Sequence, residues 1–323
     1  PVRSYLLLEK KKCRIYAAHG VSQTPNNGKY KRCLNMEKQR YKGILYIVCS
    51  AFCFALMNMF VRAAGDLPSI QKSFFRNLVA FVFAVIILKK NDIPFRCKRE
   101  NLKYLLIRSI CGTLGILCNY YAVDHLVLSD ASMLNKMSPF FAVIFSCLVL
   151  KEKVNVPQAL FVIGAFLGSL LVIKPTFSNM DLFPSVIGLL GGLGAGIAYT
   201  YVRKATLHGE KGPFIVCFFS AFSCLVTLPF LIFDYYYMSL VQIGTLLAAG
   251  LAAAGGQFTI TAAYSCAPAK EISVYDYSQI IFAAGLGFFV FGQIPDLLSW
   301  IGYAVICAMA VGMFFYNNRR IAA

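Results

Sequence analysis

Residues 128–157 read LSDASMLNKMSPFFAVIFSCLVLKEKVNVP, and most of this stretch is apolar and long enough to cross a lipid bilayer. Lys136 nevertheless lies well inside it. A lysine at the centre of a membrane helix costs about 2.5 to 3.5 kcal/mol on insertion scales, so such a residue usually faces a protein interior or a hydrated cavity. Pro139 follows and has no N–H to donate to the carbonyl of Asn135. The stretch therefore predicts a membrane helix with a charge and a free carbonyl at membrane depth.

The pattern recurs at an offset of 140 residues, where residues 271–296 read EISVYDYSQIIFAAGLGFFVFGQIPD. At that offset Lys136 corresponds to Asp276, and Asn135 corresponds to Tyr275. Other positions match at an offset of 140 or 141, among them Val61-Arg62 with Val202-Arg203, Gly115 with Gly255 and Ala122 with Ala262. A membrane charge thus has a counterpart of opposite sign in a second copy of the same unit.

This repeat predicts how the chain is divided and how it inserts. We place the first repeat at residues 42–175 and the second at residues 182–318, with five expected spans in each. Because five is an odd number, the two copies must cross the membrane in opposite orientations. Inverted repeats of this kind are typical of secondary transporters, whose substrate site lies near the bilayer midplane between the repeats.

The composition indicates a helical membrane protein with several spans. Hydrophobic residues make up 59% of the 323 residues and charged residues 14%, whereas soluble globular domains contain about 25% charged residues. Apolar segments of about 20 residues recur from Gly43 onward, without the alternation of barrel strands. We therefore expect an all-α fold with ten transmembrane helices, near residues 43–64, 70–90, 102–123, 129–150, 156–173, 183–204, 213–234, 241–265, 270–292 and 297–317.

The net charge of +17 is explained by its placement along the chain. Of the 31 Lys and Arg residues, 11 precede the first expected span and six lie between Lys89 and Lys103. With the N-terminus inside, the inner segments hold 25 basic residues and the outer segments hold three, Arg62, Lys72 and Lys174. The positive-inside rule then predicts cytoplasmic termini in a cell membrane (plasma or bacterial inner membrane), and no nucleic-acid partner is needed to explain the charge.

The remaining polar features predict neither a metal site nor a cofactor. Residues 1–41 are polar and basic, and we expect a disordered tail there, with translation starting at Met36. The twelve cysteines are scattered, mostly within spans, and form no CxxC pair, so they are interpreted as packing residues. The chain contains no GxxxxGK[ST] motif for ATP. A gradient must therefore supply the energy, or transport is facilitated.

Three segments carry a resemblance to a known family: SFFRNLVA (73–80), NYYAVDHLVLSDASMLNKMSPFFAVIFSCLVLKEK (119–153) and LLVIKP (170–175). They resemble the drug/metabolite transporter superfamily, in particular bacterial EamA-type transporters with two five-helix repeats. The second repeat matches less well, with Phe291-Gly292-Gln293 in the place of Lys151-Glu152-Lys153. The resemblance implies ten helices with cytoplasmic ends and a cavity lined largely by spans 1, 3, 4, 6, 8 and 9. It also implies, for many members, export of amino acids or other small metabolites.

Lys136 and Asp276 are the leading candidates for substrate binding, because charges inside membrane spans are usually functional. They either pair directly as a structural ion pair or bracket a site at two different depths. Tyr275 places an aromatic ring beside the acid, where it could hold an amine by a cation–π contact. We favour Tyr275 over Tyr277, because Asn135, its counterpart in the first repeat, is also polar.

Four further residues are weaker candidates for substrate binding. Asn58 corresponds to Tyr199 in the repeat, and both, like Gln257, could hydrogen-bond a polar substrate or a neighbouring helix. Arg76 could bind a substrate carboxylate or the carbonyls of a helix end. Arg108 is expected to lie close enough to the cytoplasm for its side chain to reach water.

These features predict a secondary transporter that exports a small polar metabolite such as an amino acid, by alternating access around a midplane cavity. Its expected partners are the substrate, the lipid bilayer, a coupling proton or counter-substrate, and a second copy in a homodimer. The alternatives are a nucleotide-sugar or phosphate-ester antiporter of the same superfamily, and an integral-membrane enzyme. An enzyme would need a cluster of acid–base or metal-binding residues that the spans lack, so we expect no catalysis.

Overall fold

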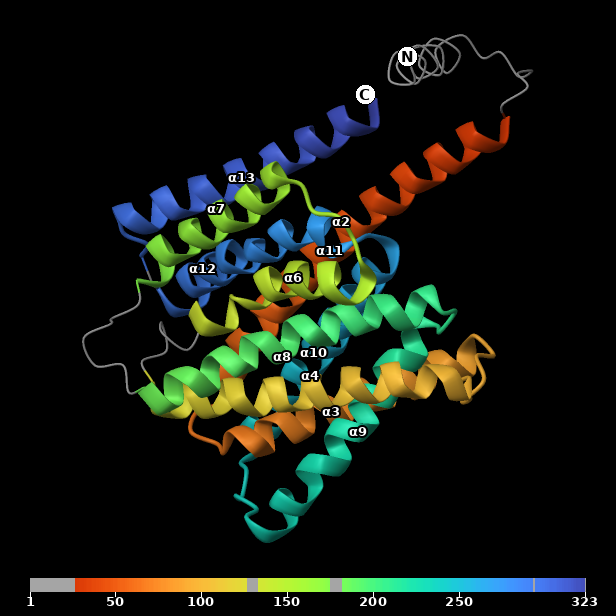
Figure 1. Ribbon diagram of the computed structural model, residues 1–323. Helices are drawn as coiled ribbons and strands as arrows, with labels where there is room; N and C mark the ends of the chain where they lie inside the picture. The colour runs from red at the N-terminus through yellow and green to blue at the C-terminus, as the bar shows by residue number, and fades with distance from the viewer. Residues whose placement is uncertain (1–26, 127–132, 175–181, 293, 323) are drawn as a thin grey trace.

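The computed structural model describes residues 27–126, 133–174, 182–292 and 294–322, and the described chain is helical (Figure 1). Its elements are α2 (Asn27–Ala63), α3 (Ser69–Lys90), α4 (Arg99–His125), α6 (Ser138–Leu150), α7 (Val156–Ile173), α8 (Leu182–Leu207), α9 (Gly212–Phe233), α10 (Leu240–Cys266), α11 (Ala269–Ile272), η2 (Ser273–Tyr277), α12 (Ser278–Phe291) and α13 (Leu297–Ala322).

The all-α polytopic membrane fold is confirmed. Within the described residues, nine helices are long and apolar enough to cross a membrane. The remaining expected span, near 270–292, is present as the consecutive elements α11, η2 and α12. The first helix differs from expectation, because α2 begins at Asn27 although the span was expected near residue 43. Residues 1–26 of the expected tail lie outside the described residues, whereas residues 27–41 belong to α2.

Packing pairs helices from the two halves of the chain in a symmetric way. Helix α2 packs on α10, just as α8 packs on α4, and α6 packs on α8, just as α12 packs on α2. Helices α3 and α9 pack on each other, and so do α7 and α13 (Figure 1). Exchanging the two halves leaves this set of pairs unchanged, as two repeats related by a two-fold axis require. Helix α2 also meets α13 near its C-terminal end, since Arg40 donates a hydrogen bond to the carbonyl of Asn317 at 3.1 Å.

Two spans are interrupted at the same place in the repeat. Helical residues 133–135 are followed by a turn at Lys136 and Met137, and α6 begins at Ser138. In the second half, the 3₁₀ segment η2 contains Asp276, and α12 begins at Ser278, 140 residues after Ser138. Pro139 explains the first interruption, because a proline is favourable in the first turn of a helix and unfavourable inside one.

Glycines in α8 allow this helix to approach the interrupted span closely. A Cβ atom on Gly192 would lie 2.5 Å from the carbonyl oxygen of Leu134, and one on Gly196 would lie 2.8 Å from the amide nitrogen of Ala142. Glycines at four-residue spacing, such as Gly192 and Gly196, permit such contact between helix backbones. Gly244 in α10 has the same spacing pattern but open space around it.

Candidate functional site

Lys136 and Asp276 form an ion pair between the two interrupted spans. The Nζ atom of Lys136 lies 3.7 Å from Oδ2 of Asp276, and the side chains are 11% and 10% exposed. The sequence left open whether the two residues pair or bracket a site at different depths. The structure brings them into direct contact.

Two further contacts hold Lys136 in place. Its Nζ atom donates a hydrogen bond of 2.6 Å to Oε1 of Gln279, and its backbone carbonyl accepts one of 3.1 Å from the hydroxyl of Tyr277. Gln279 occupies the position that Pro139 occupies in the first repeat. The same position in the repeat thus holds a helix-interrupting proline, Pro139, in the first half and the hydrogen-bond partner of Lys136, Gln279, in the second.

The tyrosines on either side of Asp276 point to different surroundings. Tyr277, buried in the helix bundle, makes the hydrogen bond to Lys136. Tyr275 is within electrostatic range of Arg40 and Glu271, and its buried hydroxyl has no hydrogen-bond partner. The contact with the lysine therefore comes from the tyrosine that we did not favour, and the substrate-binding role of Tyr275 stays a prediction. Asn135 is partly buried beside the turn at Lys136.

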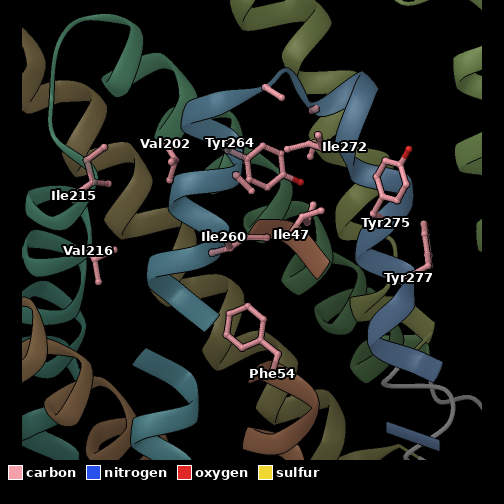
Figure 2. Packing of buried hydrophobic residues seen from close by; sticks show 14 of the residues in the cluster. Ile47, Phe54, Val202, Ile215, Val216, Ile260, Tyr264, Ile272, Tyr275 and Tyr277 are labelled. Atoms are coloured by element: carbon pink, nitrogen blue, oxygen red, sulfur yellow. The ribbon is translucent and has the colours of Figure 1, made fainter. Parts of the chain in front are cut away.

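A pair of stacked tyrosines lies next to the acid. The rings of Tyr199 in α8 and Tyr264 in α10 are parallel within 11°, with centroids 5.0 Å apart. Both tyrosines interact electrostatically with Asp276. Figure 2 shows the ring of Tyr264 directed toward Ile272, with the hydroxyl at that end. Its hydroxyl is 3.4 Å from Oγ of Ser273, so one wall of the site consists of fixed aromatic rings.

Two buried arginines also lie within electrostatic range of Tyr199. Arg76 in α3 and Arg108 in α4 are 8% and 2% exposed, and both interact electrostatically with Tyr199. Arg108 donates a hydrogen bond of 3.2 Å to Oε1 of Gln257 in α10. The expectation that Arg108 reaches water is wrong, because the packing of α4 turns its guanidinium onto the ring of Phe219, 3.9 Å from the centroid.

Of the eight predicted site residues, five are gathered, and Asn58, Asn135 and Tyr275 make no contact with the other five that the described structure shows. Lys136, Asp276, Tyr199, Gln257 and Arg76 belong to one connected interior region, whereas Asn58 is exposed on α2. Sequence reasoning missed Gln279 and Tyr264. The repeat offset carried a signal for Gln279, since it matches Pro139, but Tyr264 sits in an apolar helix with nothing to mark it.

A second ion pair joins the halves of the chain at the end of α6. Arg203 of α8 donates a hydrogen bond of 2.8 Å to Oε1 of Glu152 and one of 3.3 Å to the carbonyl of Tyr264. Ser146 donates to the other oxygen of Glu152. In the second repeat Gly292 takes the place of this acid, so the charge pair has no charged equivalent in sequence.

A third ion pair, at the other end of the bundle, is exposed to solvent. Lys174 after α7 pairs with Asp296 before α13, with side chains 42% and 51% exposed. Hydrogen bonds from Lys174 and Ser299 lower the pKa of Asp296 to about 2. Among the described residues, no group of three His, Cys, Asp or Glu side chains is placed to hold a metal ion.

Comparison with known proteins agrees with this architecture. Residues 41–174 match the model of the EamA-like transporter family. The pseudopaline exporter CntI of Pseudomonas aeruginosa is 31% identical over 276 residues, which cover 84% of this chain and 95% of that protein. A riboflavin transporter of Vibrio cholerae is 25% identical over 84% of this chain and 93% of its own. Human solute carrier family 35 member G1 is 25% identical over 84% of this chain and 78% of its own.

One solved crystal structure superimposes with a TM-score of 0.75 and 12% sequence identity, over 87% of this chain and 99% of the other. At that identity the likeness concerns the fold alone. The fold and the interior charges define a polytopic membrane protein of the transporter class. The chain belongs to the EamA-like transporter family, within the drug/metabolite transporters.

Proposed function

We propose that this protein is a secondary, ATP-independent transporter that exports a small polar metabolite, such as an amino acid, by alternating access. The observation that carries the proposal is the ion pair of Lys136 and Asp276. Each residue sits at the interruption of one of two equivalent spans. Interrupted helices at the interface of inverted repeats are where transporters of this architecture bind their substrates.

The pair suits a substrate that carries both charges. A carboxylate can replace Asp276 as the partner of Lys136, and an ammonium can replace Lys136 as the partner of Asp276. The separation of 3.7 Å is longer than a charge-assisted hydrogen bond of about 2.8 Å, so the pair exchanges partners at low cost. The rings of Tyr199 and Tyr264 offer an aromatic wall beside the ammonium.

The interrupted spans and the Glu152–Arg203 pair support alternating access. Turns at membrane depth are natural hinges, because their backbone does not depend on a continuous helical hydrogen-bond ladder. Glu152 and Arg203 belong to different repeats and lie at the end that the positive-inside rule assigns to the cytoplasm. Breaking this pair would free the ends of α6 and α8 to separate on that side.

The positive-inside count also supports a location in the cell membrane with both termini in the cytoplasm. No contact in the described structure bears on homodimer formation or on coupling to a proton, so both stay predictions. Relatives are named as transporters of pseudopaline and of riboflavin, which supports transport over catalysis. A nucleotide-sugar or phosphate-ester antiporter is the second candidate, favoured by the two buried arginines near Tyr199.

Two measurements test the proposal together. Culture media of cells with and without the protein are compared for accumulated small metabolites, and candidate compounds are then measured for flux across proteoliposomes. Export requires net accumulation outside and flux that Lys136→Met abolishes. Flux only in exchange for inorganic phosphate would favour the antiporter instead. Turnover of a lipid without any flux would establish an enzyme.

A further inference from the structure

Arg76 carries a buried positive charge that the described chain does not neutralise. The residue is 8% exposed, and within the described residues its guanidinium has neither a hydrogen-bond nor an ion-pair partner. Arginine cannot relieve burial by losing its proton at any physiological pH. Burying an unpaired charge costs several kcal/mol, so a counter-charge is required at this position.

Arg108 presents its guanidinium to the same region. Its Nη2 is bonded to Gln257, a neutral partner, whereas its buried Nε has none. A Cβ atom on Gly112 would lie only 2.3 Å from Nη1 of Arg108. The absence of a side chain at Gly112 therefore makes room for the guanidinium. Arg76 and Arg108 are close enough for their charges to repel each other.

The charges of the interior do not balance. Lys136 and Asp276 neutralise each other, which leaves the two arginines with a charge of +2. Further buried polar groups on the same helices also have no partner, among them Oδ1 of Asn77 and Oγ of Ser109. Such unsatisfied groups in a protein interior indicate a ligand or ordered water.

We propose that Arg76 and Arg108 form an anion-binding subsite and that the substrate carries at least two carboxylates in addition to an amine. This inference rests on the proposed function and names the substrate class of the same site. Guanidinium groups bind carboxylates through charge-assisted hydrogen bonds, and the Nε of each arginine is a donor without a partner in the described structure. One carboxylate can pair with each arginine, and the ammonium can pair with Asp276.

A carboxylate substrate fits the surroundings better than a phosphate does. Tyr199 interacts electrostatically with the arginines and also with Asp276, so the acid belongs to the same region as the subsite. A phosphate ester without an amine would bring its charge toward Asp276 and be repelled. A substrate with an ammonium group between its carboxylates meets each of these charges with its opposite.

L-Glutamate, L-glutamine and inorganic phosphate are suitable probes, because glutamate and glutamine differ only in one carboxylate. Binding is measured by the thermal stability of the full-length purified protein in lipid nanodiscs and by calorimetric titration. We expect glutamate to bind about tenfold or more tightly than glutamine, which corresponds to about 1.4 kcal/mol or more. Phosphate should not bind.

The preference for glutamate over glutamine should disappear when either arginine is replaced. Arg76→Gln and Arg108→Gln should bind glutamate and glutamine alike, and Gly112→Ala should weaken glutamate binding because its Cβ displaces the Arg108 guanidinium. Arg108→Lys keeps the positive charge but not the planar guanidinium. It serves as the test variant if Arg76→Gln or Arg108→Gln does not fold. Lys103→Gln, an exposed cation on the same helix, is the control and should retain the full preference.

The outcomes separate this inference from the proposed function. Equal binding of the two amino acids to the wild type, no binding of glutamate, or a preference for phosphate would each overturn the carboxylate subsite. Metabolite export that depends on Lys136 would still stand in those cases. Conversely, selective glutamate binding without flux of any compound would retain the subsite and remove the transport function.

Discussion

The Nζ atom of Lys136 lies 3.7 Å from Oδ2 of Asp276, although the residues are 140 positions apart and belong to different repeats. Each lies where its span is interrupted. The pair is therefore a contact across the interface between the repeats. Any rearrangement of one repeat against the other must stretch it, release it or carry it along.

A double-mutant cycle on this pair separates a structural from a substrate-binding role. Lys136→Met and Asp276→Asn each leave one buried charge without its partner, which costs about 3 to 5 kcal/mol when a buried pair is broken. The double variant should recover most of that stability, since replacing both partners can be nearly neutral. Thermal unfolding in nanodiscs and flux in proteoliposomes are measured on the same samples.

We expect the double variant to be stable and inactive, because the charges are needed for the substrate and not for folding. Recovery of flux together with stability would show a purely structural pair. Wild-type flux in either single variant would exclude the pair from the working site.

A second prediction concerns coupling to protons. If Asp276 takes up a proton during the cycle, Asp276→Asn abolishes transport driven by a pH gradient but retains substrate exchange, which moves no net proton. Flux is measured in proteoliposomes with and without an imposed gradient. An unchanged response to the gradient in this variant would show that protons couple elsewhere.

The Glu152–Arg203 pair should control access from the cytoplasm. Glu152→Gln weakens the contact, so a cysteine placed near residue 203 in a cysteine-free background should react faster with a cytoplasmic reagent, by roughly threefold to tenfold for about 0.7 to 1.4 kcal/mol. Asp296→Asn, at the exposed pair with Lys174, is the matched control and should change this rate little. Equal effects of the two substitutions would contradict a special role for Glu152.

The close approach of α8 to the first interrupted span predicts a large difference between two glycines. Gly192→Ala places a methyl group 2.5 Å from the carbonyl oxygen of Leu134 and should destabilise the protein by about 1 to 3 kcal/mol. Gly244→Ala, in open space on α10, should be neutral or stabilising by up to about 1 kcal/mol. Chemical or thermal unfolding measures both, and similar losses at the two positions would argue against the observed contact.

The orientation in the membrane is tested by labelling from outside intact cells. In a cysteine-free background, a cysteine placed near Asp234 should react with an impermeant reagent, and one near Glu210 should not. These positions lie at opposite ends of α9, so the comparison is made across a single helix. The reverse pattern would overturn the assignment of both termini to the cytoplasm.

The sequence by itself determined the helices, their order and the repeat. Apolar length and the position of loop residues are local properties, so the expected span near 156–173 coincides with α7. The repeat offset of 140 correctly related Ser138 to Ser278, the residues at which α6 and α12 begin. It also paired Lys136 with Asp276 as equivalent positions of opposite charge.

Only the tertiary structure decided how these positions meet. The sequence left open whether Lys136 and Asp276 pair directly or lie at two different depths. Both spans are interrupted at these residues, and the interruptions bring the side chains together. The direction of a side chain around its helix likewise depends on packing, which turns Arg108 inward onto Phe219 and makes Tyr277 the partner of Lys136. Such directions arise from contacts between segments far apart in sequence, and no local pattern records them.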